Sequence, residues 1–320
     1  MEDHIVKPPA SASVMLNGLE EQRKTLSALK VRSYIFLGAG ILMIGGGIFL
    51  GGPITVLLIC GAIPLITGIV MVARNSSRET EYQHQFKQTF IANALKEIDP
   101  SLQIDASDGL SESDFVASRL FSHRPDRYHS EDQIYGTAGK TRFSFSEVHA
   151  EYKTVTRTKN GTQEHWHTIL KGIVFCADFN KNFRGSTIVS PRDLGDVISS
   201  WISSAIPVFS RDELVKLENP TFTKTFSTYS NDQVEARYIL TPTLMERICE
   251  LNNRCSQTIS LSFTADHIFI AFPLNKNYFE APVFKTLLDP DLLQEDLALI
   301  RFMYGIIHEL DLNTRIWGKN

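Results

Sequence analysis

The sequence predicts an α+β protein that begins with a hairpin of two membrane-spanning helices and continues as a domain with an antiparallel sheet. Three observations support this fold class. No charged residue occurs between Ser33 and Ala73. Beyond residue 122 the hydrophobic pattern changes from helical to alternating, and the expected helices and strands are segregated along the chain. A long C-terminal helix is expected over Leu292–Leu310.

The uncharged stretch divides at Gly51-Gly52-Pro53 into two apolar segments, Ser33–Leu50 and Ile54–Ala73. At about 1.5 Å of rise per residue, roughly 20 residues cross about 30 Å of hydrocarbon, so each segment is long enough or nearly so. Two glycines followed by a proline are typical of a tight turn. We therefore expect a transmembrane helical hairpin.

The glycines in this stretch also invite a nucleotide-binding interpretation, which the context does not favour. After Gly38-Ala39-Gly40 the sixth position of the fingerprint is Met43, and apolar residues continue on both sides. Glycines instead recur every seven residues, at Gly38, Gly45 and Gly52, at Gly40 and Gly47, and at Gly61 and Gly68. Small residues on one helical face let two backbones approach closely in lipid, although glycine is also simply common in membrane helices.

Positive residues flank the apolar stretch on both sides, whereas the Gly-Gly-Pro turn has none. They are Arg23, Lys24, Lys30 and Arg32 before it, and Arg74 and Arg78 after it. Because positive residues remain on the cytoplasmic side, we expect a multi-pass protein of the inner (plasma) membrane with both termini in the cytoplasm. The acidic start at Met1-Glu2-Asp3 does not favour a cleaved signal peptide.

Four regions follow from these patterns. Residues 1–32 form a cytoplasmic tail and an amphipathic helix, and residues 33–73 form the transmembrane hairpin. Residues 74–121 form juxtamembrane helices, and residues 122–320 form the soluble α+β domain.

Composition excludes some classes of function. The net charge is −4 and 21% of residues are charged, so the chain lacks the basic character of a nucleic-acid-binding protein. None of the four cysteines has C-x-x-C spacing, which gives no zinc or redox motif and agrees with a reducing cytosol. We expect no cofactor.

The best candidate metal ligands are His149 and Glu151 on one expected strand and His165 and His167 on the next. Imidazole and carboxylate groups bind zinc and similar metals where they converge. Convergence depends on how the two strands pair, and therefore on the turn between them.

The sequence allows two registers for the pairing of these strands. A two-residue turn at Asn160-Gly161 places the first pair on the opposite face from the second, which leaves no site. A three-residue turn that includes Lys159 places His167 diagonal to Glu151, within reach of long side chains only. A solvated or structural face is the simpler interpretation.

Three arginines are candidate ligands for an anion. Arg124 and Arg127 lie in a charged loop, and planar guanidinium groups bind anions through two hydrogen bonds. Arg237 lies near Glu235 in Val234–Leu240, where alternation predicts a strand. Local scaffolding in the loop and a cross-strand ion pair at Arg237 are the competing interpretations.

Five phrases in this chain resemble those of a known family. They are Arg124-Pro-Asp-Arg-Tyr128, Glu147-Val-His-Ala-Glu-Tyr152, Ala177-Asp-Phe-Asn-Lys-Asn-Phe183, Ser230-Asn-Asp-Gln-Val-Glu-Ala-Arg-Tyr-Ile-Leu-Thr-Pro242 and Leu312-Asn-Thr-Arg-Ile-Trp317. The chain resembles a bacterial family catalogued as a domain of unknown function, serial number thirty-one thirty-seven, sometimes mislabelled galanin. The resemblance implies a bacterial membrane protein with two spans at its start, in a family whose members are in some cases encoded beside LemA-type membrane proteins. It implies no activity and no catalytic residue.

No serine elbow, phosphate-binding loop or catalytic Cys–His spacing occurs in the sequence. The leading hypothesis is therefore a membrane-anchored cytoplasmic adaptor or regulatory protein, which contacts the lipid bilayer and binds a membrane protein or a second copy of itself. The alternative is a module that senses a ligand or a metal. A hydrolase is a third hypothesis, and it rests only on histidines and acids that are close in sequence.

Overall fold

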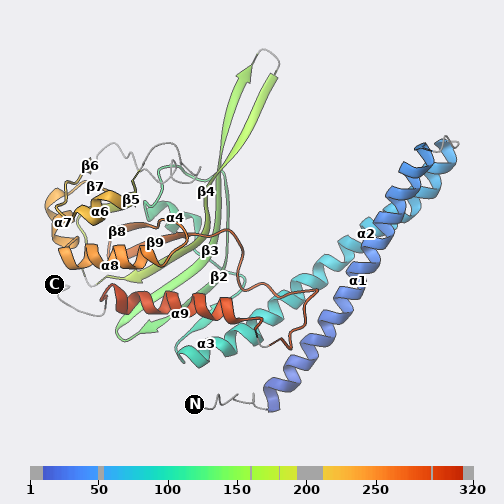
Figure 1. Ribbon diagram of the computed structural model, residues 1–320, viewed down its shortest axis with the longest axis horizontal. Coiled ribbons are helices and arrows are strands. Elements are labelled where there is room, and N and C mark those ends of the chain that lie inside the picture. The colour runs from blue at the N-terminus through green and yellow to red at the C-terminus, as the bar shows by residue number, and fades with distance from the viewer. Residues whose placement is uncertain are drawn as a thin grey trace. The chain divides into compact units, whose positions relative to one another are not determined.

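The fold was analysed in a computed structural model of the chain (Figure 1). The structure describes residues 10–49, 54–158, 161–179, 181–192, 212–289 and 291–312. The chain forms two compact units. Unit 1 comprises Met1–Asn93 and Glu280–Glu295, and unit 2 comprises Ala94–Phe279 and Asp296–Asn320.

Unit 1 is built from two long helices, α1 (Ala10–Phe49) and α2 (Ile54–Phe86). A π-helical turn, η1 (Lys87–Ile91), continues α2, and α3 (Ala92–Ile98) then leads the chain into unit 2. Among the described residues, one helix is long and apolar enough to cross a membrane, over Leu16–Gly46 of α1. The Gly51-Gly52-Pro53 turn lies outside the described residues.

Three glycines allow α1 and α2 to approach closely. A Cβ atom at Gly40 would lie 2.8 Å from the backbone nitrogen of Leu65, and one at Gly61 would lie 2.3 Å from a side-chain carbon of Ile44. Gly68 is similarly crowded, by Leu37. Gly38 and Gly45, in contrast, have nothing within 4 Å of the position of a Cβ. The seven-residue spacing therefore marks two faces, and only one of them is the interface between the helices.

Replacing Gly40 with valine is expected to destabilise the helix pair, because the new side chain would overlap the backbone of α2. Overpacking of this kind costs about 1–3 kcal/mol. Thermal unfolding of the full-length protein in detergent measures the loss. Gly38→Val is the matched control, since it adds the same branched residue to the same helix where space is open. Equal losses in the two variants would contradict this packing.

The described part of unit 2 contains a nine-stranded sheet in the order β1-β2-β3-β4-β9-β8-β5-β7-β6, with every neighbouring pair antiparallel. The strands are β1 (Gln103–Asp105), β2 (Arg127–Ala138), β3 (Thr141–Thr158), β4 (Gly161–Asp178), β5 (Ser186–Pro191), β6 (Glu213–Leu214), β7 (Phe226–Ser230), β8 (Ser260–Thr264) and β9 (His267–Pro273). The α+β class with a large antiparallel sheet is thus confirmed.

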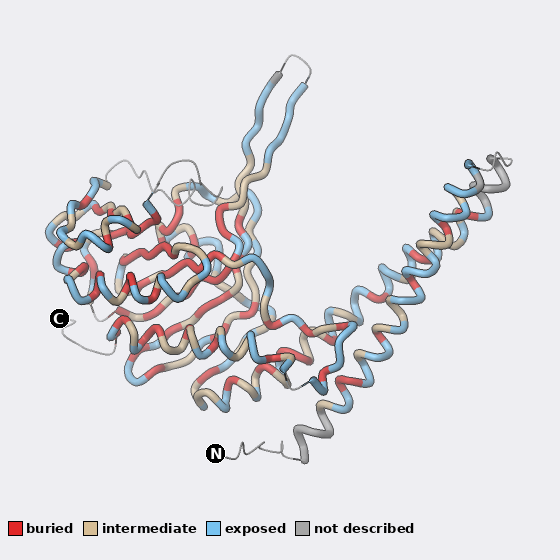
Figure 2. The backbone as a smooth tube through the Cα atoms, in the orientation of Figure 1, coloured by how far each residue is buried: buried red, intermediate tan, exposed pale blue. Residues whose placement is uncertain are grey.

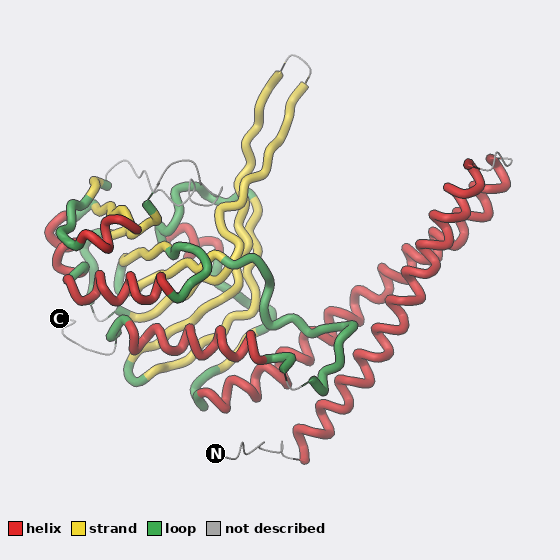
Figure 3. Tube along the Cα trace, viewed as in Figure 1, coloured by secondary structure: helices red, strands yellow, loops and turns green. Residues whose placement is uncertain are grey.

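Helices pack on both faces of this sheet (Figure 3). On one face α4 (Glu112–Ala117) contributes Phe115 to a buried cluster. The strand residues of that cluster are Val148, Ala150, Ile169, Leu170, Val174 and Ala271. On the opposite face α9 (Gln294–Glu309) places Phe302 against Phe272 and Tyr304 against Phe143, with ring centres 5.8 and 5.9 Å apart. Figure 2 shows the strands between these helices as mostly buried.

The remaining helices of unit 2 follow β6 and β7. They are α6 (Pro220–Thr225), α7 (Gln233–Ile239) and α8 (Pro242–Asn253). A threonine followed by proline, Thr241-Pro242, predicts the start of a helix, and at the start of α8 the Thr241 hydroxyl accepts a hydrogen bond from the Leu244 amide while Pro242 occupies the first turn. The long closing helix is also present, as is the hairpin of β8 and β9 that alternation in Ile259–Phe263 and His267–Phe272 predicts.

The prediction of a strand over Val234–Leu240 was wrong, because this segment forms α7. The Asp232 carboxylate caps the helix by accepting hydrogen bonds from the amides of Val234 and Glu235, at 3.0 and 2.9 Å. A short helix of seven residues shows an alternating pattern as readily as a helical one, so the cap was the more informative signal. The spacing of Leu194, Val197, Ile198 and Trp201 predicts a helix over Asp193–Ser204, which lies outside the described residues.

Candidate functional site

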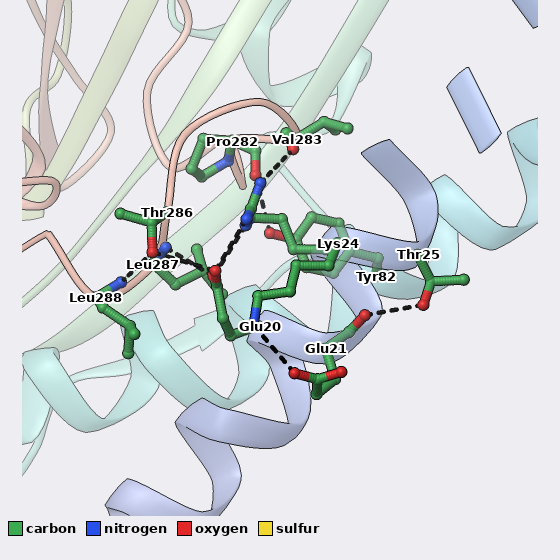
Figure 4. Close-up of polar contacts among 11 residues, drawn as sticks. Glu20, Glu21, Lys24, Thr25, Tyr82, Pro282, Val283, Thr286, Leu287 and Leu288 are labelled. Atoms are coloured by element: carbon green, nitrogen blue, oxygen red, sulfur yellow. Dashed lines mark hydrogen bonds and ion pairs between the residues drawn. The ribbon is translucent and has the colours of Figure 1, made fainter. Parts of the chain in front are cut away.

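The most elaborate polar site within one unit lies where residues 280–288, named the strap, cross α1 and α2 in unit 1 (Figure 4). The strap follows β9 in sequence and precedes α9. It has no regular secondary structure, so its backbone groups need partners from elsewhere. Side chains of both helices supply them.

On α2, the side-chain amide of Gln83 pairs with the backbone of Ala281, as a neighbouring strand would. Its amide nitrogen donates to the Ala281 carbonyl at 3.1 Å, and its amide oxygen accepts from the Ala281 nitrogen at 2.6 Å. The Tyr82 hydroxyl donates to the Pro282 carbonyl at 2.9 Å. One helical turn further along the chain, the Lys87 ammonium lies 3.4 Å from a Glu280 carboxylate oxygen, at the first residue of the strap.

On α1, Glu20 is the centre of the network. Its carboxylate accepts two hydrogen bonds from the Arg23 guanidinium, both at 2.9 Å, and bonds from the Thr286 hydroxyl at 3.1 Å and the Leu287 amide at 3.0 Å. Arg23 donates its remaining bond to the Val283 carbonyl at 2.9 Å. One ion pair on α1 therefore binds the strap at two places.

Burial makes these contacts stronger than surface ion pairs. Glu20 is only 4% exposed, and the Arg23 side chain 11%. The hydrogen bonds from Arg23 lower the pKa of Glu20 from 4.5 to about 2, helped by the Leu287 amide and the Thr286 hydroxyl and opposed by burial. Burial raises the pKa of Tyr82 to about 12, so its hydroxyl remains a donor at every physiological pH.

Strap binding is expected to depend on pH in the acid range. Because the pKa of Glu20 is lower in the folded state, its contribution is complete above pH 4.5 and is lost as the pH falls from 4.5 towards 2. The protection factor of the Leu287 amide, which corrects its exchange rate for the intrinsic pH dependence of exchange, should therefore fall over that window. In Glu20→Gln, which cannot ionise, this fall should be absent, and its persistence would assign the pH dependence to another group.

The strap also buries apolar side chains, which alternate with exposed ones. Ala281, Val283 and Leu287 are buried, whereas Phe284 is 59% exposed. On the helices, Leu19 and Leu26 are buried, as is Tyr82. The strap is thus bound through one face and presents the other to its surroundings.

Beside the strap site, α1 and α2 border an open groove of about 500 Å³. Leu26, Leu29 and Tyr82 contribute its apolar surface, and Glu81 and Arg78 contribute charge. A groove of this kind suits the apolar face of an amphipathic segment.

The strap site was not predicted from the sequence. Glu20 and Arg23 were interpreted as the polar face of an amphipathic helix, and their spacing of three residues was the available signal for an ion pair. Their partners follow about 260 residues later in a segment without periodicity. A pattern search along the chain cannot detect that pairing.

The four predicted metal ligands lie on β3 and β4 but do not meet. Thr158 pairs with Gly161, a register that neither predicted turn gives, and Asn160 lies outside the described residues. His167 consequently pairs with Tyr152 and stacks on its ring at 4.9 Å. Neighbouring residues of a strand point to opposite faces, so Glu151 is on the other face from Tyr152.

Each pair of ligands has its own surroundings. His149 lies 3.7 Å from Glu151, whereas His167 Nε2 lies 2.8 Å from the Thr154 hydroxyl. His165 pairs with Thr154 on the face of His167. Among the described residues, no three of these four side chains bring ligand atoms within 4.8 Å of one another.

The three candidate arginines are also separated. Arg127 begins β2, where its guanidinium lies 3.5 Å from the centre of the Trp166 ring and 3.7 Å from Glu151. Arg124 precedes it in an exposed loop, whereas Arg237 lies on α7. Six strand spacings of about 4.8 Å separate β2 from β7, the strand before α7, so Arg237 cannot join the other two in one anion site.

Two of the phrases that carry the family resemblance meet in unit 2. The Glu235 carboxylate on α7 accepts hydrogen bonds from the amides of Arg184 and Gly185, the shorter ones at 3.0 and 2.9 Å, and lies 3.4 Å from the Lys181 ammonium. The Asn231 side chain accepts from the Ser186 amide at 2.8 Å. These residues hold the loop between β4 and β5 and serve the fold.

Comparisons with known proteins give one family match over part of the chain and one remote structural likeness. No curated protein matches the chain. A crystal structure of the mycobacterial trehalose monomycolate transport factor A, TtfA, is similar with a TM-score of 0.36 and 9% sequence identity, over 68% of this chain and 92% of that one. A likeness this remote supports no assignment. Residues 168–312 match the model of the family described as "Protein of unknown function (DUF3137)", which confirms the resemblance for this part of the chain.

Proposed function

We propose that this protein is a membrane-anchored adaptor or regulatory protein whose helices α1 and α2 cross the inner membrane as a hairpin, with both termini in the cytoplasm. Unit 2 would be its cytoplasmic domain, and its partner a membrane protein or a second copy. The observation that carries the proposal is the outward apolar surface of both helices.

Figure 2 shows exposed residues along the described part of both helices. The exposed large apolar residues are Tyr34, Ile35, Phe36, Ile41, Leu42, Met43, Ile48 and Phe49 on α1, and Ile63, Ile66, Ile69, Val70 and Val72 on α2. Soluble monomers rarely expose apolar patches of more than a few hundred Å². Glycines at the interface with large apolar residues facing outward are typical of helices packed in lipid.

Polar contacts begin where the apolar stretch ends. The buried Asn75 amide donates to the Ser33 hydroxyl at 3.3 Å, and Lys30 pairs with Glu79 a turn further on. Both contacts join α1 to α2, so the two helices remain paired as they leave the apolar stretch. This arrangement supports entry and exit of the chain on the same side of the membrane.

The strap supports a regulatory role. It is bound to α1 and α2 by side chains, and the chain continues from its two ends into β9 and α9 of unit 2. With the chain after α2, three covalent connections therefore join the two units. A movement of the hairpin would be transmitted to unit 2 through all three connections.

Fusions to alkaline phosphatase, which is active only outside the cytoplasm, test the membrane topology. We expect an active enzyme when it follows Pro53, after one span, and an inactive one when it follows Asn320. Activity at both points would mean that α2 does not cross, and inactivity at both would mean that neither helix does. A fusion to green fluorescent protein at Asn320 should fluoresce and controls for expression.

Cross-linking of the full-length protein in its native membrane tests the adaptor role. A stoichiometric membrane partner, or a second copy of this chain, is the expected product. Exchanging residues 33–73 for an unrelated two-span hairpin is a control for contacts made by the apolar stretch itself. A protein that remains monomeric and unattached after gentle extraction would contradict an adaptor.

A further inference from the structure

We propose that the tip of the strap, Phe284 and Lys285, is a contact site for the lipid headgroups of the cytoplasmic membrane surface. This inference rests on the proposed membrane hairpin and adds a second, peripheral attachment to the bilayer. The observations are the direction of the strap, the exposure of its tip and the positive charges that border the apolar stretch.

The contacts show which way the tip points. Along α2 and its continuation η1, which lead away from the apolar stretch, Tyr82 holds Pro282, Gln83 holds Ala281, and Lys87 holds Glu280. The first leg therefore approaches the apolar stretch as its residue numbers rise.

The second leg returns in the opposite direction. Along α1, which leads towards the apolar stretch, Arg23 holds Val283, and Glu20, one turn further from that stretch, holds Leu287. The two residues between the legs, Phe284 and Lys285, are thus at the end of the strap nearest to the apolar stretch.

The distance to the bilayer is short. Arg23 precedes Ser33 by ten residues and Tyr82 follows Ala73 by nine, which is about 14–15 Å of helix. Because the chain turns back between Val283 and Thr286, the tip extends beyond these anchors by about one residue, roughly 3 Å of extended chain. Headgroups occupy about 5–8 Å on each side of the hydrocarbon, so the backbone of the tip lies a few ångströms outside this layer, and the exposed Phe284 side chain spans the difference.

The chemistry of the tip fits an anionic lipid surface. Phe284 is 59% exposed although its neighbours Val283 and Leu287 are buried, and Lys285 is exposed beside it. Aromatic rings are favoured at the level of the headgroups, and a lysine near the surface contributes about 1 kcal/mol of attraction to anionic lipid. The positive residues that border the apolar stretch, Arg32 and Arg74 among them, present charge of the same sign.

Tryptophan quenching in reconstituted vesicles tests this contact on the full-length protein. Tryptophan replaces Phe284 at the tip, Leu288 on the returning leg, or Phe36 in the apolar stretch, and the emission of the three native tryptophans is subtracted. The lipid is phosphatidylcholine brominated near the headgroup end of its acyl chains, with and without phosphatidylglycerol. We expect at least a twofold loss of the added emission for Phe36→Trp and about a twofold loss for Phe284→Trp. Leu288→Trp should be quenched less.

The variants separate the two proposals. Quenching of Phe36→Trp without quenching of Phe284→Trp would overturn the tip contact and leave the hairpin intact. Absence of quenching in both would overturn the hairpin itself. Adding Lys285→Glu to Phe284→Trp should reduce its quenching in vesicles with phosphatidylglycerol, and an unchanged value would overturn the role of Lys285.

Discussion

Replacing Glu20 with alanine is expected to release the strap from α1 and α2. The substitution removes the acceptor of four hydrogen bonds and leaves the Arg23 guanidinium, whose side chain is 11% exposed, without its carboxylate. Removing one partner of a buried ion pair costs about 3–5 kcal/mol. The free energy needed to open the strap locally should fall by about that amount. The fall is limited by the opening free energy of the unsubstituted protein.

Hydrogen exchange measures this opening residue by residue. The Leu287 amide donates directly to Glu20, and the Ala281 amide donates to Gln83 at the other end of the strap. A loss of 3 kcal/mol corresponds to about a 100-fold faster exchange where exchange occurs through local opening. Trypsin should also cleave after the exposed Lys285 more rapidly in the variant than in the unsubstituted protein.

The adjacent residue provides the matched control. Glu21 pairs with Lys24 at 3.1 Å, but its side chain is 75% exposed, so Glu21→Ala should change the opening free energy by less than about 1 kcal/mol. Equal effects of the two substitutions would mean that the Glu20–Arg23 pair does not hold the strap. Glu20→Gln should be intermediate, because an amide oxygen still accepts from Leu287 but carries no charge for Arg23.

The long helices and the sheet could be anticipated because local patterns determine them. The uncharged stretch between Ser33 and Ala73 and the alternation in Ile259–Phe263 and His267–Phe272 involve neighbouring residues only. The cap at Thr241 is equally local. These elements were placed correctly.

The register of β3 and β4 shows where local patterns stop. Asn160-Gly161 signals a hairpin, and the hairpin is present, but Thr158 pairs with Gly161 and the pairing shifts again between Ala150 and Glu151. A shift of one residue changes which side chains share a face. The predicted metal ligands depended on that choice.

The strap site could not be anticipated, since its two sides are about 260 residues apart and the strap has no periodic pattern. A carboxylate on an amphipathic helix is normally solvated. Only the docked chain, with Val283, Thr286 and Leu287 around the Glu20–Arg23 pair, reveals that this one is buried.

Replacing Glu235 with alanine is expected to destabilise unit 2 strongly. The side chain is 8% exposed and accepts hydrogen bonds from the part-buried amides of Arg184 and Gly185. A hydrogen bond to a charged group contributes about 1.5–3 kcal/mol. A total of about 3 kcal/mol lowers the melting temperature of a unit of this size by roughly 6–12 °C.

Thermal unfolding, followed by circular dichroism on the full-length protein in detergent, measures this change. Arg237→Ala is the matched control on the same helix, because Arg237 is exposed and donates only to the Gln233 carbonyl at 2.9 Å. It should lower the melting temperature by no more than about 2 °C. Similar losses in the two variants would show that Glu235 has no special part in the fold.

A second substitution, in the loop between β4 and β5, should disturb the contacts of the same loop. A Cβ atom at Gly185 would lie 2.3 Å from the Asn231 side-chain oxygen, so Gly185→Ala should destabilise unit 2 by displacing Asn231 from the Ser186 amide. Combined with Glu235→Ala, its cost should be less than additive, because both substitutions loosen one loop. Full additivity of the two stability losses would mean that the two contacts act independently. With coupling, the phrase Ser230–Pro242 and the loop that follows the phrase Ala177–Phe183 would act as one structural unit, and the resemblance would report a shared fold. Any activity would then have to be sought in other residues, among which the strap and its tip come first.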